Sequence, residues 1–204
     1  MNPLNTIKGT IIAGLVLSII VVVATPGMHI VVPPTINSVV IWAHVFAGIV
    51  WIGLLYYFNF VQVPALAEAA SDEGGPGGAG ISKYVAPRAL LWFRWGALFT
   101  WLTGAAYLGH IGKLDDAFAL GMLTDPVDPY SLTIGIGAWF GTIMLFNVWI
   151  LIWPNQKKVL GIVEASAEQI ASAKRTAFLA SRTNTMLSIP LLLSMIGAHH
   201  GWFM

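Results

Sequence analysis

The residues of this sequence that are best suited to bind a metal or a cofactor are its histidines. His44 lies within the apolar stretch WAHVFAGIVWIGLLYYFNF (42–60), and His199 and His200 stand next to each other near the C-terminus. The chain contains no cysteine, which excludes disulfides, thiolate zinc sites, iron–sulfur clusters and covalent c-type haem attachment within it. Histidine is therefore the side chain most suited to bind a metal, ahead of methionine and tyrosine.

The composition places these histidines in a membrane protein. Of the 204 residues, 57% are hydrophobic and only 9% are charged, whereas about 25% of the residues in a soluble domain carry charge. The formal net charge of +1 argues against a nucleic-acid partner. We expect a multi-pass protein of the bacterial inner membrane, surrounded by membrane lipid.

Five segments are long enough to cross a bilayer, because a spanning helix needs about 20 apolar residues. They cover approximately residues 9–32, 37–63, 87–111, 132–153 and 177–203. These segments predict an all-α integral membrane bundle that forms a single transmembrane domain over residues 1–204, with a flexible glycine-rich loop at 71–82. A cleaved signal peptide is the alternative for the first segment, which Pro26 would bend if it spans. Residues 162–174 (IVEASAEQIASAK) predict a short amphipathic helix before the last span.

The distribution of basic residues predicts the orientation of these segments. If the N-terminus is cytoplasmic, nine basic residues lie on or toward the inside, and only Lys113 lies outside. The nine are Lys8, Lys83, Arg88, Arg94, Lys157, Lys158, Lys174, Arg175 and Arg182. This excess follows the positive-inside rule and places the C-terminus in the periplasm.

With this orientation all five histidines fall in the outer half of the spans or at its edge. His44 lies about seven residues into the second span, roughly 10 Å below the outer boundary. An ionisable side chain inside a bilayer is costly unless a partner binds it, and no acidic residue lies in any predicted span. A hydrogen bond to a neighbouring helix is one explanation of His44. For His29 and His110, at the outer ends of the first and third spans, an interfacial position is the simplest explanation.

The other explanation of His44 is axial ligation of non-covalent haem b. Such a haem needs an imidazole from one or two helices and a slot for the macrocycle. The second imidazole would come from His199 or His200, and His199 shares a helical face with Asn184 and Ser188. Gly48, one turn from His44, would let a flat ring approach, although helix packing also explains this glycine. The haem iron would then be bound by His44 and His199, with His110 and His200 as further candidates at the cofactor.

A second polar layer is predicted in the inner third of the spans. It consists of Tyr57, Asn59, Arg94, Asn147, Arg182 and Asn184. The two arginines have no carboxylate at their level, so they either reach the phosphates of the inner leaflet or bind an anion. That anion would be a lipid headgroup, a haem propionate or a small substrate that the asparagines orient.

Four segments of the chain resemble one family of membrane proteins. They are HVFAGIVWIGLLYYFNFVQVPAL (44–66), YVAPRALLWFRWGALFTWLTG (84–104), GTIMLFNVWILIWPNQKKV (141–159) and LASRTNTMLSIP (179–190). In this order they resemble the N-terminal membrane domain of the bacterial membrane-bound urate hydroxylase family, also called the urate oxidase N-terminal domain. The spacing of His44, Trp51 and Gly53 is more loosely similar to membrane protoporphyrinogen oxidases and copper-resistance membrane proteins.

The resemblance implies a helical domain that works with a cytochrome c domain in the oxidation of urate. These 204 residues contain no CxxCH motif, so electrons would pass to a separate cytochrome c on the outer side or to a host complex. The first hypothesis is therefore a haem-b redox module, a component of a urate-oxidising oxidoreductase. The alternatives are an accessory subunit of a larger respiratory or photosynthetic membrane complex with no substrate of its own, and a transport or metal-handling protein of the copper-resistance type.

Overall fold

The structure is a computed structural model that describes residues 2–24 and 35–201. Within these ranges every regular element is a helix and none is a strand, which confirms the all-α prediction. By its internal contacts the chain divides into two units, Met1–Val39 and Val40–Met204, while the prediction of one transmembrane domain stays a prediction. The first unit holds the short turn η1 (Pro3–Asn5) and helix α1 (Ile7–Ala24). The predictions for Pro26 and His29 fall outside the described residues.

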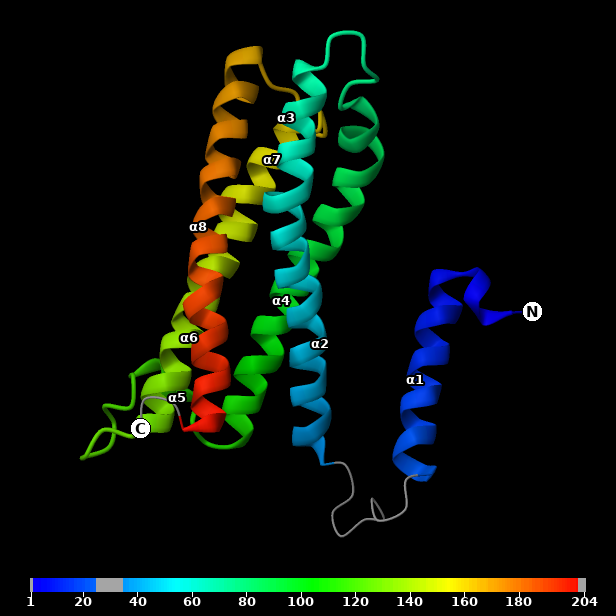
Figure 1. The fold of residues 1–204 in the computed structure, drawn as a ribbon. Helices are drawn as coiled ribbons and strands as arrows, with labels where there is room; N and C mark the ends of the chain where they lie inside the picture. The colour runs from blue at the N-terminus through cyan, green and yellow to red at the C-terminus, as the bar shows by residue number, and fades with distance from the viewer. Residues whose placement is uncertain (1, 25–34, 202–204) are drawn as a thin grey trace. The chain divides into compact units, whose positions relative to one another are not determined.

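Four long helices of the second unit lie alongside one another, and successive ones run in opposite directions (Figure 1). They are α2, α4, α6 and α8, and three of them are extended or preceded by shorter elements. In chain order the elements are α2 (Ile36–Tyr56), η2 (Tyr57–Gln62), α3 (Val63–Ser71), η3 (Ile81–Val85), α4 (Ala86–His110), α5 (Leu114–Phe118), α6 (Pro129–Phe146), η4 (Asn147–Ile152), α7 (Trp153–Val159) and α8 (Ala167–His200).

Two continuous helices are long and apolar enough to cross a membrane. One runs from Ile36 to Ser71 through α2, η2 and α3, and the other runs from Pro129 to Val159 through α6, η4 and α7. In α1 the shorter stretch Ile7–Val21 is also apolar. Length and composition thus support the second and fourth predicted spans, and the bundle of five spans is not confirmed.

Each of the three π-helical segments ends two residues before a proline. Gln62, Val85 and Ile152 end η2, η3 and η4, and Pro64, Pro87 and Pro154 follow in the first turn of the next α-helix. A proline has no N–H to donate and its ring collides with the carbonyl one turn earlier. A wider turn before the proline relieves that collision, so both long candidate spans continue through their prolines.

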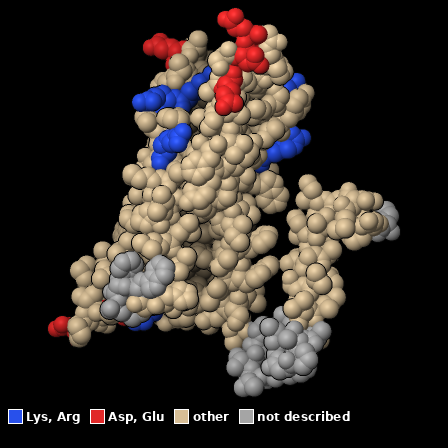
Figure 2. All heavy atoms as spheres, viewed as in Figure 1, with Lys and Arg blue, Asp and Glu red and all other residues tan. Residues whose placement is uncertain are grey.

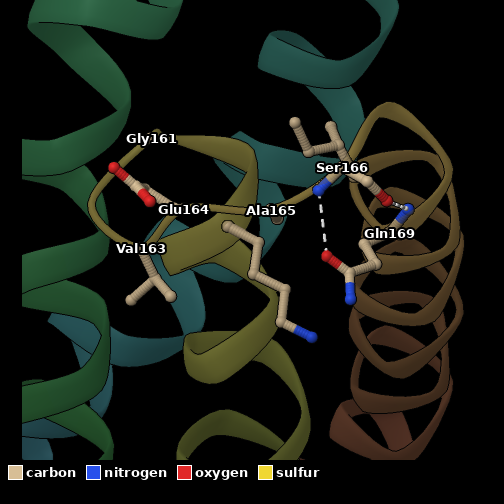
Figure 3. A pocket seen from close by; sticks show the side chains of 8 residues that line it. Gly161, Val163, Glu164, Ala165, Ser166 and Gln169 are labelled. Atoms are coloured by element: carbon tan, nitrogen blue, oxygen red, sulfur yellow. Dashed lines mark hydrogen bonds between the residues drawn. The ribbon is translucent and has the colours of Figure 1, made fainter.

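The last long helix begins earlier than the sequence pattern suggested. The prediction of a separate short helix at 162–174 is wrong, because α8 starts at Ala167 and continues without a break to His200. Figure 3 shows the reason at Ser166, whose hydroxyl accepts from the Gln169 N–H at 3.2 Å while the Gln169 side chain accepts from the Ser166 N–H at 2.9 Å. This capping box satisfies two backbone donors at the helix start.

Buried amides hold the helices together at mid-length. The Asn184 side chain is fully buried; it accepts from Asn147 Nδ2 at 2.8 Å and donates to the Met144 carbonyl at 3.0 Å. Asn59, also buried, donates to the Leu55 carbonyl of its own helix and to the Ser181 hydroxyl of α8, each at 2.8 Å. These bonds tie α8 to the two long candidate spans.

Charged side chains gather at one end of the second unit and leave its middle uncharged. Figure 2 shows most lysines and arginines in a band between acidic side chains at the very end and a broad uncharged surface. At the opposite end, Lys113 and Asp128 form the only ion pair among the residues that the structure describes, at 2.8 Å. Asp128 also caps α6, since its carboxylate accepts from the backbone N–H and the hydroxyl of Ser131.

We expect the substitution Asn184→Ala to lower the free energy of unfolding by about 1–3 kcal/mol, because it leaves the part-buried Asn147 amide without its partner and removes the bond from α8 to the Met144 carbonyl. Thermal unfolding in detergent measures the loss. Asn155→Ala is the control, since the Asn155 amide bonds only to the Leu151 carbonyl of its own helix near the surface. Equal destabilisation by both substitutions would contradict the special role of Asn184.

The ion pair between Lys113 and Asp128 predicts that the stability of the fold depends on pH. Hydrogen bonds from Lys113 and Ser131 lower the pKa of Asp128 to about 2, below the value of about 3.9 expected in an unfolded chain. The carboxylate therefore stabilises the fold above pH ~4, and this contribution is lost as the pH falls toward 2. Asp128→Asn keeps a helix-capping side chain but should remove this part of the pH dependence of unfolding. An identical acid profile in both proteins would contradict the assignment.

Candidate functional site

His44 is held by a backbone carbonyl of the neighbouring helix. Its Nδ1 lies 2.8 Å from the Thr100 carbonyl oxygen in α4, and the Thr103 hydroxyl lies 3.4 Å from the same nitrogen. Since a carbonyl can only accept, Nδ1 carries the proton and Nε2 of the neutral imidazole keeps a free lone pair. A carbonyl that fixes the tautomer in this way is the usual second partner of a histidine that binds a metal.

A glycine in α4 makes room for this imidazole. A Cβ placed on Gly104 would lie 2.9 Å from His44 Cε1 and 3.1 Å from Nδ1, closer than van der Waals contact allows. Gly104 therefore permits α2 and α4 to approach until His44 reaches Thr100. Sequence reasoning missed this residue, although Gly104 follows Thr100 by one turn in the same apolar segment and that spacing could have drawn attention to it.

His44 faces an apolar cavity of about 720 Å³ between α2, α4, α6 and α8. This volume falls within the range typical of small-molecule and cofactor sites. Most of its wall is aliphatic or aromatic, and five glycines from three helices leave parts of the wall flat. They are Gly48, Gly53, Gly104, Gly137 and Gly141. The cavity lies in the half of the bundle where α2 begins and α8 ends.

His199 and His200 line the same cavity from α8. His199 Nδ1 lies 3.2 Å from the Met195 carbonyl of its own helix, so its Nε2 is also free to bind a ligand. Its ring lies near two aromatic rings, with centroids 6.4 Å from Tyr107 and 5.9 Å from Tyr130. The fold therefore brings together His44, Gly48, His199 and His200, which the sequence assigned to one cofactor.

The remaining predicted site residues lie elsewhere. His110 is the exposed last residue of α4 and is absent from the cavity wall. None of the five residues predicted for an anion or substrate lines the cavity: Asn59, Arg94, Asn147, Arg182 and Asn184. The asparagines bond to one another and to their surroundings, whereas the guanidinium groups of Arg94 and Arg182 lie over the rings of Trp153 and Phe178.

The cavity offers imidazole rather than carboxylate chemistry. Over residues 2–24 and 35–201, no three His, Asp or Glu side chains come close enough together to hold a bare metal ion. Two histidines from different helices in the wall of one apolar cavity fit a cofactor that brings its own equatorial ligands. The residues present thus fit haem b, whose iron needs only axial ligands from the protein.

The packing of the His44 ring against Gly104 can be tested directly by substitution. We expect Gly104→Ala to displace the His44 ring, break its bond to Thr100 and destabilise the protein by about 1–3 kcal/mol. Gly109→Ala on the same helix is the matched control, since no atom lies within 4 Å of the added Cβ and alanine favours helix over glycine by roughly 0.5–1 kcal/mol. Unfolding in detergent distinguishes the two, and a Gly104→Ala protein as stable as Gly109→Ala would contradict the packing argument.

Comparison with known proteins gives one family match. The model of the family described as urate oxidase N-terminal matches residues 128–204, which cover α6, η4, α7 and α8 and include His199 and His200. No curated protein and no solved structure matches the chain significantly. The resemblance predicted from the sequence is thus confirmed over this segment: residues 128–204 match the urate oxidase N-terminal family.

Proposed function

We propose that the chain is a membrane-embedded redox module that binds haem b and passes electrons to a cytochrome on the outer side. One observation carries this proposal above all. His44 of α2 and His199 of α8 line a single apolar cavity, and a backbone carbonyl holds Nδ1 of each so that each Nε2 is free. Two imidazoles of this kind on separate helices are the usual axial ligands of a haem in a helical bundle.

Each of these cavity residues would have a separate role in holding the haem. His44 and His199 would hold the iron, with His200 as the alternative on α8, and Gly48 would give space to the face of the ring. The cavity wall includes no lysine or arginine, so the propionates would have to lie at the mouth of the cavity. When bound, haem b supplies a one-electron couple, and the apolar walls that keep water from it would tune its potential.

The electron donor would be a small substrate such as urate. The family match suggests a urate-oxidase-related domain, and Arg94 and Arg182 are the groups predicted to hold an anionic substrate. An accessory subunit without a substrate of its own is the second candidate. The asparagine bonds favour it, because the side chains of Asn147 and Asn184 already bind each other and backbone within the bundle.

Haem content tests the proposal directly. We expect the purified chain, produced with an adequate haem supply, to show a Soret band and a reduced-minus-oxidised difference spectrum. His44→Gln and His199→Gln should each lower haem occupancy by about ten-fold or more. Loss of a residue that only orients a metal-binding histidine already lowers metal affinity about 10–100-fold, and loss of the histidine itself should cost at least as much. Glutamine keeps a donor for the backbone carbonyl but lacks the imidazole nitrogen, so the fold is preserved while the ligand is lost.

His110→Gln is the matched control, because His110 lies outside the cavity wall and its replacement should leave the pyridine haemochrome assay unchanged. A chain without haem would overturn the proposal. Unchanged haem in His44→Gln would also overturn it, since the iron would then be bound elsewhere. Replacing His200 in the same way decides which residue of α8 binds the iron.

A further inference from the structure

Two cations share one tryptophan ring at the charged end of the bundle. The Arg94 guanidinium carbon lies 3.8 Å from the centroid of the Trp153 ring, and the Lys157 ammonium lies 5.9 Å from the same centroid. Arg94 belongs to α4, whereas Trp153 and Lys157 are one turn apart in α7. The indole face attracts both cations, so two helices present positive charge at a single point.

The packing around this point fixes the position of Arg94. Trp149 Nε1 donates to the Arg94 carbonyl at 3.2 Å. The ring of Trp95 meets the Trp149 ring edge-on, with centroids 5.5 Å apart. The backbone of α4 is therefore tied to the helix that carries Trp153 and Lys157.

No carboxylate balances these two charges in the part of the chain that the structure describes. The one ion pair there joins Lys113 and Asp128 at the opposite end. Two cations at one ring repel each other unless an anion lies between them. In Figure 2 the lysines and arginines form a band below the acidic side chains, so the band and the acids stand at different levels.

The surroundings favour an anion that is part of a lipid. Next to Arg94 on α4, Trp92 is 56% exposed and Trp95 is 42% exposed, and Phe99 further along the helix is 53% exposed. Tryptophans that point outward beside a band of basic residues are typical of the headgroup level of a membrane. The cation pair thus stands where an exposed apolar face begins, the position at which a lipid phosphate meets its acyl chains.

We infer that Arg94, Trp153 and Lys157 form a binding site for the phosphate of an anionic phospholipid. The guanidinium would bind two phosphate oxygens in its planar fork, the ammonium would bind a third oxygen, and the indole would hold both cations in place. This inference rests on the proposed membrane embedding and is independent of haem. Of the anions considered for Arg94, which were a lipid headgroup, a haem propionate and a small substrate, this site would bind the lipid headgroup.

Lipid nanodiscs test the site. The full chain is placed in discs of phosphatidylcholine with or without phosphatidylglycerol, and native mass spectrometry measures the phosphatidylglycerol that it retains. A direct hydrogen bond from a charged side chain to a phosphate is stronger than the general attraction of a basic residue to an anionic surface, so Arg94→Gln and Lys157→Gln should each lower the apparent affinity about ten-fold or more. Lys158→Gln is the matched control, because it removes the same charge one residue away from the Trp153 site and should lose only the general attraction, about five-fold or less.

The outcomes separate the sources of the anion. Equal losses in Lys157→Gln and Lys158→Gln would overturn the site, since a general surface potential would explain them. Inorganic phosphate that stabilises the chain in phosphatidylcholine discs as well as phosphatidylglycerol does would also overturn it, because the anion would then be soluble. A chain that enters the discs without preferring the anionic lipid overturns only this inference, whereas a chain that does not enter them overturns the proposed embedding as well.

Discussion

Several polar side chains on the apolar helices of this protein bond to groups on neighbouring helices, and these contacts hold the bundle together. If the bundle lies in a bilayer, as proposed, no water is present there to satisfy an unpaired donor, and a bond to a neighbouring helix meets that need. His44 reaches the Thr100 carbonyl, Asn147 reaches Asn184, and Trp149 reaches the Arg94 carbonyl. Each of these bonds joins two different helices. Together they determine where α2, α4, the α6–α7 helix and α8 stand against one another.

The same constraint prepares the candidate site. The Nδ1–H of His44 donates to the Thr100 carbonyl, so the donor of the ring is satisfied. Nε2 has no hydrogen bond to any residue that the structure describes and can bind a ligand. The approach needs Gly104, while Gly48 and Gly53 on α2 line the cavity wall without a side chain. A single helix–helix contact thus places the imidazole, selects its tautomer and leaves a flat wall beside it, which are the requirements of a planar cofactor.

The sequence predicted the parts of this structure that depend on composition and spacing. Apolar runs predicted helices, and helical periodicity with alternating directions brought His44, His199 and His200 to the same end of the bundle. The sequence did not predict features that depend on contact between helices. The space at Gly104 follows from the position of α4 against α2, and the wider turns before Pro64 and Pro154 follow from the continuation of each helix past its proline. The start of α8 was within reach, because Ser166 and Gln169 have the spacing of a capping box.

The two polar layers of the bundle serve different purposes. Asn59 lies fifteen residues after His44 on one continuous helix, roughly 22 Å along its axis. At that level the buried amides of Asn59 and Asn184 are satisfied within the bundle, and the helices are drawn together. At the level of His44 the wall residues are mostly apolar and include several glycines, and the helices leave a cavity. At the level of the asparagines the amides are bonded to one another and to the backbone, whereas at the level of His44 the bond to Thr100 occupies only Nδ1 and leaves Nε2 beside the cavity. The level of His44 is therefore the one that can bind a cofactor through an imidazole.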